Sequence, residues 1–341
     1  MQTYLFVFLL FCETFLSCHP GAGKNRVLAA EIQSAGFNQI PPPGMPVSDV
    51  VFQSDDAGTT WRDISDGLPD DMRPNTIGSA NGIVLLGMDN GIISTSATTG
   101  LWERDPLFDE TIFEIFPGAT GPYVLTQWHG LYQNLYGTGV WAPMHHNLGD
   151  KTVQTILETS NGALFFGCEN SIYRSSTKGN SWLKVAEGFD VKTITEANGV
   201  LIAGCRNGLL RSADGGETWT PVLKTRQPVV TIRSLNNEII ALVENYTKDD
   251  NNAETRLVFS SSDNGLNWQC INGSLPVELR SIYALERLGN TLVACSNAGI
   301  FRSSDEGKTW EKVREAPTGR GQSFRMTVSG QSIYVLVAAG C

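Results

Sequence analysis

Short apolar runs alternate with clusters of turn-forming residues along most of the chain, from residue 47 onward. Several of these runs lead directly into a polar segment of similar sequence. They are Val51-Phe52, Ile172-Tyr173, Leu209-Leu210, Val258-Phe259 and Ile300-Phe301. Because the runs are short and bounded by Gly, Asn, Asp and Ser, the pattern predicts β-strands that each enter a tight turn. We therefore expect an almost all-β chain with no substantial helix.

The polar segment has the pattern Ser-x-Asp-x-Gly-x-Thr-Trp. It is complete at residues 54–61, 212–219 and 303–310, carries Asn for Thr at 261–268, and lacks the Asp at 175–182. Weaker copies that keep the Trp lie at 95–102 and 134–141. The Asp and Ser side chains can accept backbone N–H bonds in a tight turn, the Gly permits a positive φ, and the Trp is a large apolar anchor. These structural roles are predicted for Asp56, Asp214, Asp263, Asp305, Trp61, Trp219, Trp268 and Trp310.

The spacing of the segments predicts the architecture. Their Trp residues stand at positions 61, 102, 141, 182, 219, 268 and 310, so the period is 37–49 residues. A period near 40 with four short strands per unit is typical of β-propeller blades, and seven units predict seven blades. The first unit lacks an inner strand pair, whereas residues 323–329 and 332–338 add two strands after the last segment. We therefore expect strands from both ends of the chain to share one blade and close the ring.

The repeated segment resembles the Asp-box, or BNR, repeat of the sialidase-like β-propellers, and the resemblance covers residues 47–341. It implies that the box is a structural turn between the outer two strands of each blade, away from the ligand face. The layout is similar to that of the photosystem II assembly-factor-like and sortilin-like propellers, which are not catalytic. The resemblance therefore implies a binding or assembly module.

The first 46 residues are expected to lie outside the propeller. Residues 1–18 are predicted to be a signal peptide, because the apolar run at 4–11 is too short to span a bilayer. Residues 15–18 loosely resemble a lipoprotein cleavage site, which leaves lipidation of Cys18 and simple secretion as alternatives. The Pro-rich residues 19–46 are predicted to be a disordered linker. The expected location is secreted, cell-surface or periplasmic.

Net charge and cysteine content narrow the range of expected binding partners and cofactors. A net charge of −10 argues against a nucleic acid partner and against docking by charge on an anionic membrane, so membrane contact is expected only through Cys18. Four cysteines occupy one equivalent position, the end of the second strand of a blade, where a small buried residue is expected: Cys168, Cys205, Cys295 and Cys341. Cys270 is expected to be unpaired in an outer strand. Because no Cys/His metal spacing is present, we expect no metal and no cofactor, and we expect a monomer.

One candidate binding feature is Trp128 with His129. Trp128 is the one Trp outside the boxes, and it falls in the loop between the second and third strands of blade three. Its indole suits stacking on a sugar ring or another planar group. The alternative is a packed turn residue that covers the channel. A second feature, the long loop of blade six at residues 244–255, carries many oxygen ligands but fits no calcium motif, so a solvated loop is favoured.

Another candidate feature is a set of arginines near the starts of innermost strands in neighbouring blades, Arg73, Arg280 and Arg325. Together they could clamp a carboxylate. The alternative is that they are surface residues paired with nearby acids, namely Asp70, Asp71 or Glu278.

The function predicted from the sequence is an exported, non-catalytic propeller that binds a carbohydrate or a cell-envelope protein on its channel face. An alternative is a glycoside hydrolase of the sialidase or xyloglucanase type, with Glu110, Glu114 and Asp71 as the candidate carboxylates. A single seven-bladed ring matches neither hydrolase layout, so we do not expect an enzyme. A purely structural head in a cell-surface assembly is the third hypothesis.

Overall fold

The structure, a computed structural model, describes residues 47–69, 73–80, 82–96, 100–135, 140–144, 152–235, 238–248, 254–317 and 322–339. Contacts divide the chain into two units, Met1–Phe37 and Asn38–Cys341, and the described residues all belong to the second. The expected signal peptide and linker lie outside them.

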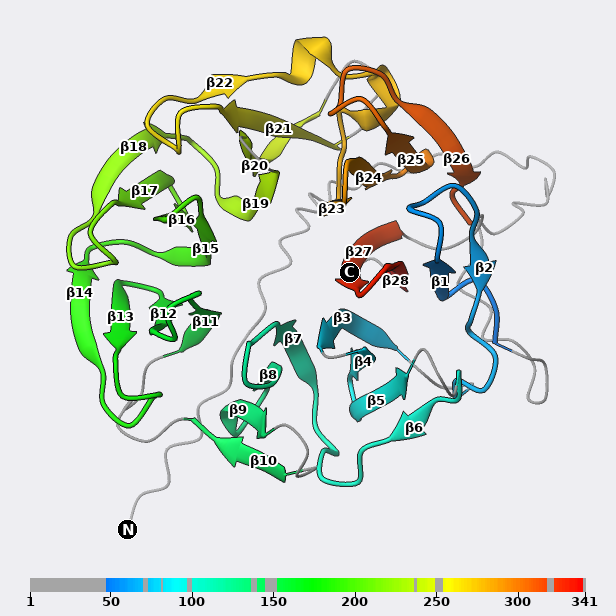
Figure 1. The fold of residues 1–341 in the computed structure, drawn as a ribbon, viewed down its shortest axis with the longest axis horizontal. Coiled ribbons are helices and arrows are strands. Elements are labelled where there is room, and N and C mark those ends of the chain that lie inside the picture. Colours follow the sequence, from blue (N-terminus) through cyan, green and yellow to red (C-terminus); the bar gives the residue numbers. More distant parts are fainter. Residues whose placement is uncertain are drawn as a thin grey trace, which may run out of the picture. The chain divides into compact units, whose positions relative to one another are not determined.

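The second unit is a ring of seven four-stranded antiparallel sheets around a central channel (Figure 1). The innermost strands, blade one to seven, are β27 (Gln322–Ser329), β3 (Pro74–Ala80), β7 (Ile112–Phe116), β11 (Val153–Glu158), β15 (Val191–Ala197), β19 (Val229–Leu235) and β23 (Ala284–Leu288). The second strands are β28 (Ser332–Ala339), β4 (Ile83–Met88), β8 (Tyr123–Thr126), β12 (Leu164–Cys168), β16 (Val200–Cys205), β20 (Glu238–Lys248) and β24 (Thr291–Ser296). The third strands are β1 (Val51–Ser54), β5 (Gly91–Ser96), β9 (Gly130–Leu135), β13 (Ser171–Ser175), β17 (Gly208–Ser212), β21 (Glu254–Ser261) and β25 (Gly299–Ser303). The outer strands are β2 (Arg62–Asp63), β6 (Glu103–Arg104), β10 (Val140–Pro143), β14 (Leu183–Glu187), β18 (Thr220–Lys224), β22 (Gln269–Cys270) and β26 (Glu311–Glu315).

This architecture confirms the predicted seven-bladed, all-β propeller. Two single-turn 3-10 helices, η1 (Asn272–Ser274) and η2 (Val277–Leu279), are the helices in the described ranges. No helix within those ranges has the length and apolar character needed to cross a bilayer.

Blade one is built from both ends of the chain, as expected. Its strand order is β2-β1-β28-β27, so β1 from the start of the ring pairs with β28 from its end. Val51 faces Leu336 in this pairing, and the Ser332 hydroxyl donates to Asp55 at 2.5 Å. Pairing these strands removes two open sheet edges and closes the ring.

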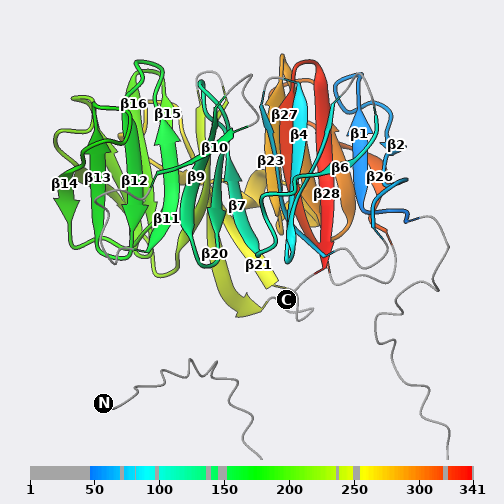
Figure 2. The ribbon, with the colours of Figure 1, turned by 90° about the horizontal axis from the view of Figure 1, so that it is seen from below.

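Because strand direction alternates within each blade, loops gather at two faces. The turns between second and third strands and the connections to the next blade lie at one face, which we call the connector face. The boxes and the turns between first and second strands lie at the other, the box face. Figure 2 shows β20 and β21 extending beyond the other strands at one edge of the ring, and their joining turn places this edge at the connector face.

The hydrophobic core lies between neighbouring blades, and each box Trp contributes to it. Trp61 of blade one packs against a cluster that contains Val293 of blade seven. Trp219 of blade five meets Phe165 of blade four edge to face, with ring centroids 6.3 Å apart. The box turn is therefore anchored to the preceding blade.

The boxes form the same hydrogen-bond network in most blades. In the last box, the buried Ser303 hydroxyl donates to Asp305 and accepts from the Gly307 N–H, both at 2.8 Å. Asp305 also accepts from the N–H and hydroxyl of Thr309 at 2.9 and 2.6 Å. The Trp310 indole N–H donates to the Gly307 carbonyl at 3.1 Å. The box at 54–61 repeats all of these bonds. The box at 261–268 repeats them with the Asn267 side-chain amide donating to Asp263 at 2.7 Å in place of the threonine hydroxyl.

The box glycine has two roles, one predicted and one not. Its φ is positive, at +84° for Gly58 and +83° for Gly216. It also lies against the preceding blade, because a Cβ on Gly216 would stand 2.2 Å from the Phe165 ring. The residue before the glycine also has a positive φ, 55° at Ala57 and 63° at Glu306. Only glycine fits both the conformation and the contact.

We expect Ser303→Ala to lower the free energy of unfolding by about 1–3 kcal/mol, because it leaves the Gly307 N–H without its acceptor. Urea denaturation monitored by Trp fluorescence would measure the loss. The exposed neighbour Ser304 offers a matched control, and Ser304→Ala should stay within about 0.5 kcal/mol of the unsubstituted protein. Equal effects of the two substitutions would contradict the assigned role of the box serine.

The box carboxylates predict an acid-sensitive fold. Hydrogen bonds from Thr309, followed by one from Ser303, lower the pKa of Asp305 to about 2, and bonds from Thr60 first lower the pKa of Asp56 to about 2. A lowered pKa means that the unfolded chain takes up protons before the folded one, so stability is present above about pH 4 and is lost as the pH falls toward 2. Thermal melts from pH 5 to pH 2 should show a falling midpoint. In Asp305→Asn the melting temperature should fall less steeply as the pH is lowered. An unchanged pH dependence would contradict the explanation.

Candidate binding site at the channel and its mouth

The channel wall is shaped by a repeated irregularity of the innermost strands. From blade two to blade six, the register between the first two strands shifts near the start of the innermost strand. The residues that follow the shift are Thr76, Glu114, Thr155, Thr193 and Thr231. The last four of these line the channel. A β-bulge re-aims side chains in this way. Residues 153–156, 191–194 and 229–232 carry the matching sequence Val-x-Thr-Ile, a repeated sequence that marks these threonines.

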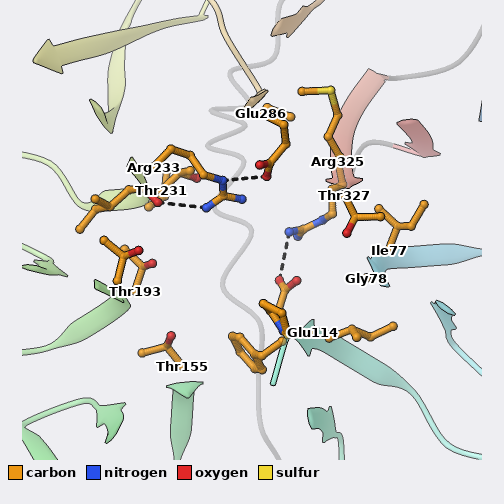
Figure 3. Close-up of a pocket in the computed structure, with 18 of the residues that line it drawn as sticks. Ile77, Gly78, Glu114, Thr155, Thr193, Thr231, Arg233, Glu286, Arg325 and Thr327 are labelled. Carbon is orange, nitrogen blue, oxygen red and sulfur yellow. Dashed lines mark hydrogen bonds and ion pairs between the residues drawn. The ribbon is translucent and has the colours of Figure 1, made fainter. Parts of the chain in front are cut away.

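One ion pair links two blades along the channel wall. The Glu114 carboxylate accepts from the Thr76 hydroxyl at 2.7 Å and from Arg325 Nη1 at 3.0 Å. The pair joins blade three to blade one across the face of blade two. Figure 3 shows Arg325 and Glu114 pointing toward each other.

A second pair joins blades six and seven. Arg233 Nε donates to Glu286 at 2.8 Å, and Arg233 Nη1 donates to the Ile232 carbonyl at 3.1 Å (Figure 3). Glu244 and Arg256 stand opposite each other in the β20–β21 register. The channel has a volume of about 720 Å³ and is lined by both signs of charge in pairs.

The Trp128 loop lies at the connector face, between β8 and β9, where the sequence placed it. Trp128 is 75% exposed, whereas the Glu110 side chain beneath it is only 11% exposed. Glu110 accepts from the Trp128 backbone N–H at 2.7 Å and contacts His129 Nδ1 at 2.7 Å. Burial alone would raise the pKa of Glu110, but these two bonds outweigh it and lower the pKa below its usual value. The carboxylate therefore remains ionised and fixes the loop that presents the indole.

The three candidate arginines occupy different places. Arg325 lines the channel, with 45% of its side chain exposed. Arg73 and Arg280 are exposed residues of the connections that lead into β3 and β23, and neither is among the residues that line the channel. Asp70 and Asp71, proposed as alternative partners, lie outside the described residues.

The three candidate catalytic carboxylates are likewise separated. Glu114 lines the channel, Glu110 lies in the connection between β6 and β7 and is hydrogen-bonded to the Trp128 loop, and Asp71 lies outside the described residues. A Tyr–Glu contact does exist elsewhere: Tyr123 donates to Glu158 at 3.1 Å, with Tyr123 only 1% exposed. Burial, followed by the Glu158 charge, raises the pKa of Tyr123, which keeps its phenol protonated rather than nucleophilic.

The described cysteines are all free. Cys168, Cys205 and Cys295 are buried and Cys270 is exposed, as expected, whereas Cys341 lies outside the described residues. Burial raises the pKa of Cys205 to about 12, so its thiol is unreactive. In the part of the chain that the structure describes, no group of three or more His, Cys, Asp or Glu residues is placed to hold a metal ion.

Comparisons with known proteins agree with this architecture. Residues 175–340 match the family model described as photosynthesis system II assembly factor YCF48. The structure of YCF48 from Cyanidioschyzon merolae is similar with a TM-score of 0.56 and 13% identity, covering 79% of this chain and 95% of that one. A structure of YCF48 bound to D1 peptide also has a TM-score of 0.56, with 16% identity over 78% of this chain and 94% of that one. The sequence matches no curated protein at a significant level.

The chain is a BNR-type propeller that resembles the YCF48 assembly factor. An ancestral GH74 enzyme is also similar, with a TM-score of 0.53 and 14% identity over 79% of this chain, but this chain spans only 48% of that enzyme. At these identities the structural likenesses show the fold alone. The match to the YCF48 family model, by contrast, favours a binding or assembly module over an enzyme.

The channel threonines require glycine at the facing positions of the second strand, and this requirement can be tested. A Cβ on Gly204 would lie 2.7 Å from the Thr193 methyl and 2.9 Å from the Val229 carbonyl oxygen. We therefore expect Gly204→Ala to cost about 1–3 kcal/mol of unfolding free energy through overpacking. A Cβ on Gly273 would meet no atom within 4 Å, so Gly273→Ala should change stability by less than about 0.5 kcal/mol. Denaturant midpoints would test the difference, and a harmless Gly204→Ala would refute the close packing.

Proposed function

We propose that this protein is a non-catalytic binding module that holds a segment of a protein partner against the connector face of the ring. The observation that carries the proposal is the exposed indole of Trp128, which a nearly buried carboxylate fixes through the backbone. Trp is the residue type most enriched among the side chains that dominate binding energy at protein interfaces. A loop that is already ordered also loses less entropy when a partner binds.

The nature of the ligand is supported by two further points. One of the similar structures is YCF48 bound to D1 peptide, which supports a polypeptide ligand for this chain. The net charge of −10 disfavours a polyanionic partner. Residues 1–18 support export, either as a secreted protein or with a lipid on Cys18, so we propose a partner in the cell envelope.

We propose no catalytic step. A glycosidase needs two carboxylates free to act across the bond that is cleaved. Glu114 and Glu286, which line the channel, are each engaged by an arginine. The geometry therefore supports binding better than hydrolysis.

The proposal can be tested by selecting peptides on the immobilised full chain from a displayed library of the host's own protein segments. Selected peptides would then be measured by fluorescence anisotropy against three proteins: the unsubstituted chain, Trp128→Ala and Leu183→Ala. Leu183 is 66% exposed on the outer strand β14 and serves as the control for loss of an exposed apolar side chain. We expect Trp128→Ala to weaken binding by about tenfold or more and Leu183→Ala to leave it unchanged.

Two outcomes would overturn the proposal. Peptides that bind Trp128→Ala as tightly as the unsubstituted chain would show that the indole is not the anchor. A selection that enriches no host segment above an empty support would argue against a polypeptide ligand.

A further inference from the structure

Three hydroxyl groups form an arc on one side of the channel. Thr155, Thr193 and Thr231 belong to the innermost strands of three successive blades, and Figure 3 shows them on the side opposite the Glu114–Arg325 pair. All three line the channel. Within the described ranges, none of their hydroxyls has a hydrogen-bond partner in the protein.

The orientation of these hydroxyls follows from packing. Thr155 faces Gly167 across the sheet, and Thr193 faces Gly204. In each case the threonine methyl occupies the space above the glycine, since a Cβ there would lie 2.9 or 2.7 Å from it. With the methyl held on the sheet, the hydroxyl is directed away from it. Each such hydroxyl can donate one hydrogen bond and accept two.

The opposite side offers complementary groups. Arg325 carries five N–H donors, and its ion pair with Glu114 uses Nη1. Glu114 has two oxygens, one bound by Thr76 and the other by Arg325, and each keeps further acceptor capacity. The pair therefore presents donors and acceptors side by side.

Charges around the arc cancel. Glu114 balances Arg325, and Glu286 balances Arg233. The one lysine among the channel-lining residues, Lys192, is paired with Asp190 at 2.9 Å. A ligand that carried net charge would gain no uncompensated partner among these groups, so the site favours a neutral and strongly hydrogen-bonding molecule.

We propose that this level of the channel binds a neutral saccharide unit. Vicinal sugar hydroxyls each donate and accept, so one hydroxyl can donate to Glu114 while its neighbour accepts from Arg325. The remaining hydroxyls face the arc of Thr155, Thr193 and Thr231. A volume of about 720 Å³ lies within the range of pockets that hold small molecules. This ligand differs from the polypeptide segment proposed for the connector face and does not depend on it.

The test uses variants that remove a hydroxyl and keep the shape. The full chain would be titrated with neutral hexoses, pentoses and their disaccharides, with glucuronate and glucosamine as charged comparisons, up to millimolar concentrations, by saturation-transfer NMR. Thr155→Val and Thr193→Val should each weaken binding of a neutral sugar by about fivefold. Thr152 is an exposed threonine just before β11, and Thr152→Val should leave binding unchanged. Neither channel variant should lower the melting temperature, because neither hydroxyl bonds the protein.

A charge variant tests whether the balanced charges of the channel are the reason that the site favours a neutral ligand. Glu114→Gln leaves the Arg325 charge uncompensated and keeps the size of the side chain. It should raise the affinity for glucuronate relative to glucose. Three results would overturn the proposal: no neutral sugar binds, a bound sugar is unaffected by both channel valines, or the unsubstituted chain prefers the charged sugars.

Discussion

The contact between a box tryptophan and the blade before it is the interaction on which the ring depends. The turn that carries the Trp also brings its glycine against the same neighbour, so Trp219 and Gly216 both meet Phe165. In the two weakest copies of the box, at residues 95–102 and 134–141, the Trp contact remains and the indole N–H has another acceptor. Trp102 donates to the Ile64 carbonyl of blade one at 2.8 Å. The polar network of the box therefore serves to present one large apolar side chain at a fixed angle.

The ring could be predicted because its information is local and repeated. Each box occupies eight consecutive residues, and its recurrence along the sequence reports the number of blades without any knowledge of long-range contacts. Closure was also predictable, since β1 has only the outer strand β2 as a partner nearby in sequence, and the strand pair β27 and β28 is left over at the other end. The expected strand at residues 332–338 differs from the observed Ser332–Ala339 by one residue. Shifts of this size do not move a blade.

The channel could be predicted only in part, because its chemistry depends on register and on distant contacts. Glu114 and Arg325 are 211 residues apart in sequence, and only ring closure brings them together. A one-residue bulge in β11 interrupts the regular alternation of side chains between Val153 and Thr155. The sequence alone therefore does not show which side of the sheet Gln154 and Thr155 face. Similarly, Trp128 and Glu110 were both identified as candidates, but for different functions. The sequence contained no sign that the carboxylate holds the Trp128 loop rather than acting as a catalyst.

The two sets of polar groups in this ring differ in how completely they are satisfied, and this difference separates stability from recognition. In the last box the Ser303 hydroxyl and both oxygens of the Asp305 carboxylate are hydrogen-bonded within the turn. In the channel, by contrast, the Glu114–Arg325 pair is 31% and 45% exposed, and a pair with that exposure contributes only about 0–1 kcal/mol to stability. Apolar side chains of similar volume would hold the innermost strands equally well or better. A charge-balanced channel with unsatisfied hydroxyls is therefore better explained by a ligand than by the needs of folding.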